Sequence, residues 1–339
     1  MKIAVDAMGG DHAPEEIVKG AIEAAKKYSC EIVLVGDRDR INSVLEQNDR
    51  SELISIRHAS DVIEMGEHPS EAVRSKKNSS IVVATEMVKN GECDAVLSAG
   101  STGAAAASAQ LILRRIRGIG RPAIATPIPT PRGVTLMLDS GGSVDIKPEH
   151  LAQIGMMAAI YAEHVLGRQN PTVGLLNIGE EETKGNEQVK ATYQLLKNTT
   201  AFNFVGNVEG RDIPTGEVDV VLCDGFIGNV VLKFAEGLAD TIMGLLREAI
   251  EDGGMTAKLG ALMLAPTLKK LGKRLDASEY GGAPLLGVNG CCVISHGSSN
   301  AKAICSAIGA ANEYVDSNVL GHIKSALEKQ NVDNSDVCL

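Results

Sequence analysis

One pattern occurs six times along the chain and limits its fold more than any other feature. A short apolar run leads into a glycine-rich polar loop and then into a run of helical length, as in KIAVDAMGGDHAPEEIVKGAIEAAKK and CDAVLSAGSTGAAAASAQLIL. The six copies begin near residues 2, 93, 133, 173, 218 and 291. Strands that alternate with helices form parallel sheets, because each crossover helix returns the chain to the same edge. The sequence therefore predicts an α/β fold with a mostly parallel sheet and helices on both faces.

The position of the polar loops follows from this architecture. In open α/β sheets, ligands bind outside the carboxyl ends of the strands. Each of the six loops directly follows a predicted strand. We therefore expect the six loops to share one binding site.

The length and composition agree with a single large α/β domain. The chain has 339 residues, of which 44% are hydrophobic but only 3% aromatic, with no Trp, so the core must be aliphatic. The segment RPAIATPIPTPRGVTLML predicts a hairpin that turns at residues 131–133 and joins two lobes. We expect one catalytic domain at 1–330 in two lobes, including an amphipathic helical segment at 229–280, and a flexible tail at 331–339.

Charge and cysteine content argue against several classes of protein. The formal net charge of −10 is unfavourable for a broad nucleic-acid surface. The seven cysteines are scattered without zinc-site spacing, which indicates a reducing cytosol and no metal. The first residues lack the charged-then-apolar pattern of a leader, and no apolar run approaches the ~18 residues of a membrane span, so we expect any membrane contact to be at the surface.

Two glycine-rich loops have the composition of anion sites. In SAGSTGA, the residues Gly100, Ser101, Thr102 and Gly103 stand between a strand and an Ala-rich helix, where backbone N–H groups and the helix dipole favour phosphate. In SHGSSNA, the hydroxyls at 298 and 299 are either phosphate ligands or helix caps. For the first loop, the alternative is a tight turn that lets helix and strand pack.

Two further loops carry polar side chains with more than one interpretation. His12 in DAMGGDHAP is a proton donor or anion ligand, or else it hydrogen-bonds only to hold its own loop. Asn229 in CDGFIGNVVLK, at the start of a predicted helix, is a helix N-cap or an amide that stabilises an oxyanion.

The loop NIGEEETKGN places three adjacent carboxylates, at 180–182, shortly before a single lysine, Lys184. Adjacent carboxylates repel one another, so their clustering suggests a site. We expect Lys184 to be the cation of that site and the glutamates to start and orient the following helix, where carboxylates favour the positive end of the dipole. Glu181 is expected to pair with Lys184 or to position it.

The segment MTAKLGALMLAPTLKKLGKRLD predicts amphipathic helix on both sides of Pro266, with a kink or two short helices at the proline. Leucines form one stripe after the break, and basic residues stand opposite, a pattern typical of a helix lying on an anionic membrane surface. The alternative is a helix packed on its own protein or on a second subunit. The residues assigned to this surface are Leu264, Leu268, Leu271, Lys269, Lys270 and Lys273.

Signatures of other enzyme classes are absent from the sequence. There is no P-loop GxxxxGK[ST], no dinucleotide fingerprint placed between a strand and a helix, and no GxSxG elbow. We therefore expect neither an ATPase nor covalent catalysis by serine, and we expect no cofactor.

Six motifs together resemble one family: DAMGGDHAP, SAGSTGA, NIGEEETKGN, CDGFIGNVVLK, YGGAPLLGVNG and ISHGSSNA, in one order from residue 2 to about residue 314. The chain resembles the bacterial acyl-acyl carrier protein:phosphate acyltransferases of phospholipid synthesis. The resemblance implies a homodimeric, Rossmann-like α/β/α enzyme, related to phosphotransacetylases and isopropylmalate-type dehydrogenases. Such an enzyme makes acyl phosphate from acyl carrier protein thioesters and inorganic phosphate at the cytoplasmic face of the membrane, where it feeds an integral glycerol-3-phosphate acyltransferase.

The resemblance also assigns roles to residues of this chain. The expected catalytic residues are Lys184 and Asn229 for the oxyanion and His12 for positioning or for protonation of the leaving group. The expected phosphate and substrate ligands are Asp11, Gly100, Ser101, Thr102, Gly103, Asn177, Gly179, Glu181, His296 and Ser298. Two positions depart from the family pattern, because serine stands at 101 and 143 where the family commonly has asparagine.

Three other functions remain open at this point. A phosphotransacetylase that uses acyl-CoA would share the fold and the phosphate site. An NAD-dependent dehydrogenase of the related fold is less favoured, because the sequence has no convincing metal-binding Asp cluster and no cofactor fingerprint. A non-catalytic scaffold for lipid enzymes at a membrane surface is the third.

Overall fold

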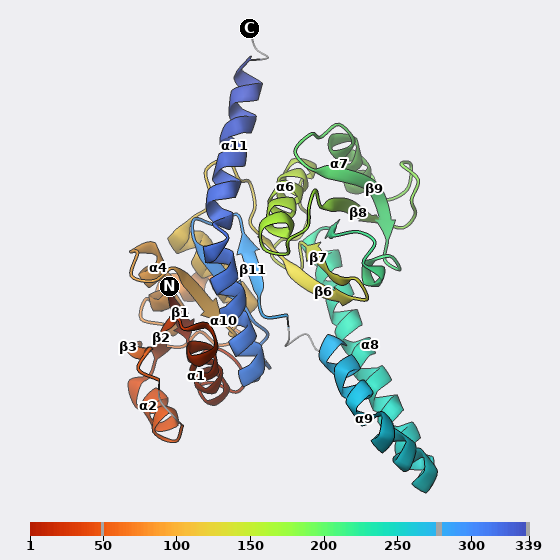
Figure 1. Cartoon of the computed structure of the whole chain (residues 1–339). Coiled ribbons are helices and arrows are strands. Elements are labelled where there is room, and N and C mark those ends of the chain that lie inside the picture. The colour runs from red at the N-terminus through yellow and green to blue at the C-terminus, as the bar shows by residue number, and fades with distance from the viewer. Residues whose placement is uncertain (49–50, 276–279, 337–339) are drawn as a thin grey trace.

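The computed structural model describes residues 1–48, 51–275 and 280–336, and the side chains in these ranges except those of residues 271, 273–275 and 330–336. The strands form two sheets, each in its own lobe (Figure 1). The first sheet has the order β3-β2-β1-β4-β12-β11-β5, and the second has the order β6-β7-β10-β8-β9. All neighbouring strands are parallel except at β11, which is antiparallel to both neighbours, and between β6 and β7. The predicted α/β class is confirmed.

The first lobe contains seven strands and the helices that cover both faces of their sheet. Its strands are β1 (Lys2–Asp6), β2 (Glu31–Gly36), β3 (Ile54–His58), β4 (Ala95–Ser98), β5 (Ala123–Ile124), β11 (Ala283–Leu286) and β12 (Cys291–Ile294). Its helices are α1 (Glu15–Tyr28), α2 (Arg38–Glu46), α3 (Pro69–Ser75), α4 (Ser80–Lys89), α5 (Thr102–Ser108) with the π-helix η1 (Ala109–Leu113), α10 (Ala301–Asp316) and α11 (Val319–Asp336).

The second lobe has five strands and a long helical hairpin that projects away from it (Figure 1). Its strands are β6 (Thr126–Thr130), β7 (Gly133–Leu138), β8 (Thr172–Asn177), β9 (Asn203–Glu209) and β10 (Val220–Leu222). Its helices are α6 (Pro148–His164), α7 (Glu187–Lys197), the 3₁₀-helix η2 (Ile213–Thr215), α8 (Gly225–Asp252) and α9 (Gly254–Leu275).

The six sequence units are all present as strand–loop–helix, but they divide between the two sheets. Units beginning at β1, β4 and β12 belong to the first sheet, and those beginning at β7, β8 and β10 belong to the second. The expectation that all six loops share one site therefore needs correction, because each sheet has a carboxyl edge of its own. Only Ala125 separates β5 of the first sheet from β6 of the second, so the chain changes sheets within one residue.

The predicted hairpin is confirmed, and it begins the second lobe directly after the chain changes sheets at Ala125. Strand β6 pairs antiparallel with β7 from Thr126–Met137 to Thr130–Gly133, and Gly133 adopts a φ of 119° at the turn. The prolines at 127 and 129 cannot donate hydrogen bonds to a neighbour, which places β6 at the edge of its sheet.

Aliphatic side chains fill the core, as the composition predicts. One buried cluster runs from the face of the first sheet covered by α1 and α10 into the second lobe, where it includes Leu138, Ile154 and Leu222. A second cluster lies under α3, α4 and α5, and a smaller one lies on the other face of the second sheet. The two lobes thus share a continuous apolar core.

Helix ends and breaks differ locally from the sequence-based expectations. Helix α8 begins at Gly225 with Asp224 as its N-cap, so Asn229 lies inside the helix and is not a cap. Helix α9 runs through Pro266 as a single helix rather than two. Helix α11 extends to Asp336 and so includes the first part of the expected tail, whereas residues 337–339 lie outside the described residues.

Helices α1 and α10 of the first lobe pack closely against each other at Gly20 of α1. A Cβ at this position would lie 2.6 Å from the Cβ of Ile304 and would also meet the carbonyl oxygen of Ala301, both on α10. We expect Gly20→Ala to lower the free energy of unfolding by about 1–3 kcal/mol, because overpacking outweighs the better helix propensity of Ala. Chemical denaturation measures this change.

Gly237→Ala on α8 is the matched control, because a Cβ there has no atom within 4 Å among the described residues. Helix propensity alone then acts, and we expect stabilisation of up to about 1 kcal/mol. Equal effects of the two substitutions would show that α1 and α10 do not approach as closely as described.

Candidate active site

Three adjacent parallel strands of the first sheet, β1, β4 and β12, end side by side. Asp6 is the last residue of β1 and is only 3% exposed. Its Oδ2 accepts a hydrogen bond from the Ser98 hydroxyl at the end of β4 (2.7 Å), and its Oδ1 accepts one from the Met8 amide (3.2 Å). Burial raises the pKa of Asp6, and the hydrogen bonds from Ser80, Ser98 and the backbone oppose that rise.

The loops after these three strands meet through their backbones at glycine. Gly10 adopts a φ of 113°, and a Cβ there would lie 3.1 Å from the carbonyl oxygens of both Ala99 and Gly297. The Asp11 amide donates to the Gly297 carbonyl at 2.8 Å. A side chain at Gly10 would separate the loops, which explains why the second glycine of DAMGGDHAP is a glycine.

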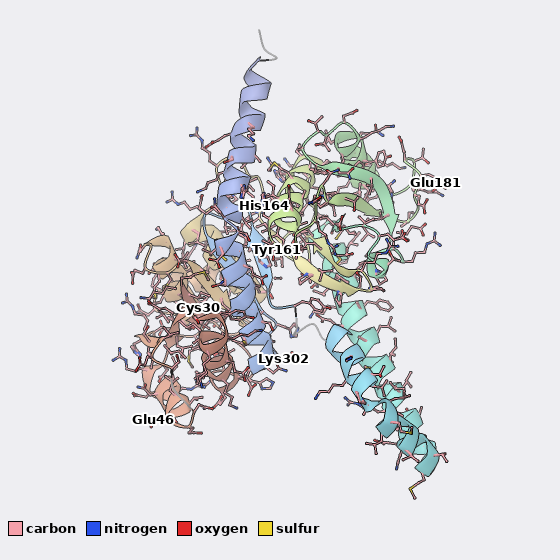
Figure 2. All side chains as sticks on the ribbon, viewed as in Figure 1. Cys30, Glu46, Tyr161, His164, Glu181 and Lys302 are labelled. Carbon is pink, nitrogen blue, oxygen red and sulfur yellow. The ribbon has the colours of Figure 1, made fainter. Side chains whose placement is uncertain are left out.

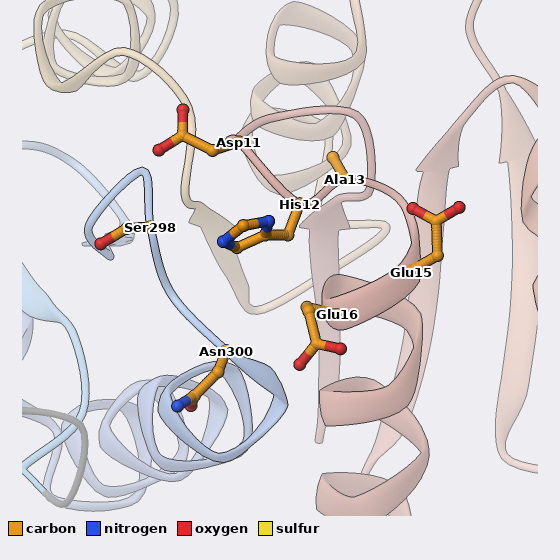
Figure 3. Close-up of a pocket in the computed structure, with 7 residues that line it drawn as sticks. All are labelled: Asp11, His12, Ala13, Glu15, Glu16, Ser298 and Asn300. Atoms are coloured by element: carbon orange, nitrogen blue, oxygen red, sulfur yellow. The ribbon is translucent and has the colours of Figure 1, made fainter.

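An open pocket of about 470 Å³ lies where the loops after β1 and β12 meet the start of α1. Figure 3 shows the His12 ring inside this pocket, on the side facing Ser298. The lining residues are Asp11, His12, Ala13, Glu15, Glu16, Ser298 and Asn300. The structure therefore brings together Asp11, His12 and Ser298, three of the predicted site residues.

Protein groups already satisfy the first amides of α10 at this pocket. The Glu16 carboxylate accepts from the Ala301 amide (2.8 Å), and this bond, together with Lys19, lowers the pKa of Glu16. The Asn300 side chain is the N-cap and accepts from the Ala303 amide (3.0 Å). The serines are therefore not the caps of this helix: Ser299 bonds with Ser295 (2.8 Å) and is buried, whereas Ser298 remains at the pocket.

The SAGSTGA loop borders the same loop junction. The Gly100 amide donates to Ser98 Oγ (3.1 Å), and a Cβ on Gly100 would lie 3.3 Å from the Cα of Gly9. Ser101 is the N-cap of α5 and accepts from the Ala104 amide at 3.4 Å, so a hydroxyl serves as the cap at this departure from the family pattern. Gly103 lies against Pro69, and Thr102 is exposed at the first turn.

His296 connects the two lobes. Its Nδ1 lies 2.7 Å from the Ser298 hydroxyl, and its Nε2 lies 2.9 Å from the Nζ of Lys233, which belongs to α8 of the second lobe. Lys233 stands four residues, about one helical turn, after Asn229. The exposed Asn229 lies beside Gly141, whose Cβ position would be 3.6 Å from the Asn229 Oδ1.

Sequence reasoning missed Asp139, which is fully buried at the end of β7. Its Oδ1 accepts from the amides of Ile124 and Gly142, both at 3.0 Å, and its Oδ2 has no partner among the described residues. Burial raises its pKa to about 6, against the effect of backbone hydrogen bonds. The sequence does contain a sign of this site, because LDSGG has an aspartate at a strand end followed by two glycines. The same pattern occurs in VDAMGG, which contains Asp6.

The Lys184 loop follows β8 in the second lobe and is closed by its own polar groups. The side-chain amide of Asn177 donates to the backbone carbonyl of Lys184 (3.1 Å). The backbone amide of Lys184 donates to the backbone carbonyl of Glu181 (3.0 Å). A Cβ on Gly179 would lie 3.1 Å from the Lys184 Cγ, so the glycine leaves room for the lysine stem. Asn177, Gly179 and Glu181 thus shape the Lys184 loop.

The glutamates of this loop do not start the next helix. Helix α7 begins at Glu187 with Asn186 as N-cap, and Glu182 pairs with Lys197 at 2.8 Å. The link from Glu181 to Lys184 is a backbone hydrogen bond. Figure 2 shows Glu181 on the side of the second lobe turned away from the first. Among the described residues, Lys184 forms no hydrogen bond or ion pair with His12 or Ser298, so its expected place beside them stays a prediction.

The helical hairpin exposes an apolar surface. On α9, the exposed fractions are 86% for Met255, 60% for Leu259, 71% for Leu262, 77% for Met263 and 57% for Leu264. Lys269 and Lys270 are exposed and Leu268 is half-buried, whereas the side chains of Leu271 and Lys273 lie outside the described residues. None of the helices in the described ranges has the length and apolarity needed to cross a bilayer.

The described part of the chain contains no disulfide among its cysteines. It holds no group of three or more His, Cys, Asp or Glu side chains arranged for a metal ion. Six cysteines there are buried free thiols, and Cys338 lies outside the described residues.

The fold defines the class of this protein. The structure resembles that of EutD phosphotransacetylase from Staphylococcus aureus with a TM-score of 0.61 at 17% identity, covering 92% of this chain and 94% of the other. A phosphotransacetylase from Streptococcus pyogenes gives the same TM-score at 18% identity over 94% of both chains. A 4-hydroxythreonine-4-phosphate dehydrogenase from Klebsiella pneumoniae gives 0.51 at 14% identity, covering 93% and 99%. The protein has the two-lobed α/β fold that these enzymes share.

Sequence comparison identifies the family within that class. Residues 1–322 match the family described as fatty acid synthesis protein. The chain is 57% identical over 330 residues to a phosphate acyltransferase of Desulfitobacterium hafniense (strain DSM 10664 / DCB-2), covering 97% of this chain and 98% of the relative. It is 54% identical over 328 residues to that of Pelotomaculum thermopropionicum, covering 97% and 95%. The chain belongs to the phosphate acyltransferase family of fatty acid and phospholipid synthesis, and it is an acyltransferase, as the resemblance predicted.

The buried carboxyl of Asp139 makes folding stability depend on pH. The pKa of Asp139 rises from 3.8 to about 6 on folding. Its contribution to folding stability is therefore fully present below pH 3.8 and is lost as the pH rises through about 6. At about 1.4 kcal/mol per pKa unit, this loss is about 3 kcal/mol. We expect Asp139→Asn to gain up to that much stability relative to the parent protein between about pH 4 and about pH 8, measured by denaturant unfolding.

Asp145→Asn, an exposed change in the same loop, is the control. Its stability relative to the parent protein should vary little with pH. A constant difference between Asp139→Asn and the parent across the pH range would contradict the raised pKa.

Proposed function

We propose that this enzyme transfers a long-chain fatty acyl group from acyl-acyl carrier protein to inorganic phosphate and releases acyl phosphate for phospholipid synthesis. The observation that carries the proposal is the meeting of the DAMGGDHAP, SAGSTGA and ISHGSSNA loops at one strand edge, with His12 and Ser298 at a shared pocket. Family membership supports a phosphate acceptor, and the six family motifs support a carrier protein thioester as donor.

The chemistry requires positioning and electrostatic stabilisation more than a strong base. A phosphate oxygen attacks the thioester carbonyl carbon, a tetrahedral oxyanion forms, and its collapse breaks the C–S bond and releases the carrier thiolate, which takes up a proton. Phosphate is already anionic near neutral pH and a thiolate leaves readily, so no covalent enzyme intermediate is needed. The enzyme must hold the anion against the carbonyl and stabilise the oxyanion.

The proposal assigns a role to each of four residues. His12 and Ser298 contact the substrates in the pocket, where His12 positions the anion or protonates the leaving thiolate. The Asn229 amide is exposed on α8 and supplies an oxyanion donor. Lys184 is the cation for phosphate and the oxyanion. Its ammonium has no carboxylate within 4.0 Å among the described residues, so it is available to a substrate anion.

The proposal also covers the oligomeric state of the enzyme and the place where it acts. It acts as a homodimer without a cofactor, in the cytoplasm and against the inner face of the cell membrane. There it passes acyl phosphate to the membrane glycerol-3-phosphate acyltransferase. The exposed apolar residues of α9, with Lys269 and Lys270 beyond them, support contact with an anionic lipid surface.

A direct assay tests the reaction. With a long-chain acyl carrier protein thioester, we expect release of free carrier protein that depends on inorganic phosphate, and much less turnover with acetyl-CoA. Lys184→Ala should lower kcat/KM by about 10²-fold or more, the loss typical of one transition-state donor, while circular dichroism and the melting temperature stay unchanged.

Lys190→Ala, an exposed lysine on the following helix, is the matched control and should keep parental activity. Turnover of acetyl-CoA above the carrier protein thioester would reassign the enzyme to the phosphotransacetylase reaction. Near-parental activity of Lys184→Ala would remove Lys184 from the catalytic residues.

Binding to lipid vesicles tests the α9 surface. Leu262→Glu with Met263→Glu should weaken binding to vesicles that contain anionic lipid by at least about tenfold, because two exposed apolar side chains become charged. Thr241→Glu with Thr256→Glu adds the same charge at exposed positions of the same hairpin and should have a smaller effect. Equal binding of both double variants would locate the lipid contact elsewhere.

A further inference from the structure

Three polar contacts in series connect α8 of the second lobe to the pocket of the first. The Nζ of Lys233 lies 2.9 Å from His296 Nε2, and His296 Nδ1 lies 2.7 Å from Ser298 Oγ. Lys233 also donates to the Glu236 carboxylate at 2.9 Å. Ser298 lines the pocket, whereas Lys233 and His296 do not.

The chemistry of the first contact decides where the histidine proton lies. A lysine ammonium has three donors and no acceptor, so His296 Nε2 must accept from it. A neutral imidazole that accepts at Nε2 carries its proton on Nδ1. The opposite tautomer would direct an Nε2–H at the ammonium and lose a charge-assisted hydrogen bond.

The histidine tautomer then decides the orientation of the serine hydroxyl. With its proton on Nδ1, His296 donates to Ser298 Oγ, which acts as the acceptor in that contact. The hydroxyl proton of Ser298 is therefore left to donate elsewhere. The backbone amide of Ser298 donates to Nδ1 at 3.3 Å, which favours the opposite tautomer, but the contact at Nε2 is shorter and charge-assisted and is therefore the stronger of the two.

We propose that Lys233 is a positioning residue that holds His296 with its proton on Nδ1, so that the Ser298 hydroxyl donates its proton to the phosphate in the pocket. Lys233 acts through His296 and does not touch the substrate. The inference rests on the proposed function, because it takes inorganic phosphate to be the anion beside Ser298. It adds to that function a contribution of the second lobe to acceptor binding in the first.

Glu236 fits the same role. It stands three residues after Lys233 on α8 and holds the ammonium from the other side. The lysine is therefore fixed between a carboxylate of its own helix and an imidazole of the other lobe. The Glu236 carboxylate and the Nε2 lone pair of His296 thus accept from one ammonium group.

The test combines kinetics with a direct observation of the tautomer in the full-length protein. In ¹⁵N-histidine-labelled protein, with signals assigned by their loss in His296→Gln, we expect the Nδ1–H form of His296. Lys233→Met should shift His296 toward the Nε2–H form. It should raise KM for inorganic phosphate about tenfold, as for one lost hydrogen bond to a charged group, and leave KM for the acyl thioester within about twofold.

Further variants separate a positioning role of Lys233 from a general loss of structure. Lys233→Arg keeps a cationic donor and should restore KM for phosphate to within about twofold of the parent value. Arg247→Met, an exposed charge change farther along the same helix, should leave both KM values unchanged. Ser298→Ala should raise KM for phosphate as Lys233→Met does, and the double variant should add little, because both act through one hydroxyl.

The outcomes separate this inference from the proposed function. An Nε2–H form of His296 in the parent protein, or an unchanged KM for phosphate in Lys233→Met, overturns the positioning role even where phosphate-dependent turnover is normal. A parent protein that releases no carrier protein in response to phosphate overturns the proposed function. The parent tautomer is read without any variant, so a misfolded Lys233→Met leaves the test intact.

Discussion

The contact on which the site depends most is the backbone meeting at Gly10. The loops after β1, β4 and β12 come from segments far apart in the sequence, yet the carbonyl oxygens of Ala99 and Gly297 both lie 3.1 Å from where a Gly10 Cβ would be. Below this junction, the buried Asp6 accepts from Ser98 and so ties the end of β1 to the end of β4. His12 and Ser298 reach one pocket only because these loops are held at such close range.

The second lobe also has a buried aspartate at the carboxyl edge of its own sheet. Asp139 directly follows β7, is buried, and precedes two glycines at 141 and 142, as Asp6 precedes Gly9 and Gly10. Here the carboxylate accepts from Ile124, the last residue of β5 in the first sheet, so it also joins the lobes. Burying a carboxylate costs free energy. In both lobes the buried carboxylate lies where backbone amides or a hydroxyl donate hydrogen bonds to it and so offset part of that cost.

Much of the fold could be predicted because its signals are local. Each strand–loop–helix unit and the hairpin at residues 131–133 are encoded by neighbouring residues, and all are present. The division into two sheets could not be predicted, because strand pairing depends on contacts between distant segments. Of the two interpretations of Asn229, the structure excludes the helix cap, because the carboxylate of Asp224 caps α8. His12 and Ser298 were found by motif, whereas Lys233 was missed, because its contact with His296 spans 63 residues and two lobes.

Anion binding in a chain with a net charge of −10 must depend on local donors rather than on the overall field. The pocket even includes Asp11 and Glu16. Glu16, however, is already engaged by the Ala301 amide and by Lys19 at 3.1 Å, which offsets part of its charge. Under the proposed function, the affinity of this pocket for phosphate depends on which of its polar hydrogens point into it. A hydroxyl that can either donate or accept binds an anion well only when its other contact is fixed, and for Ser298 that contact is His296.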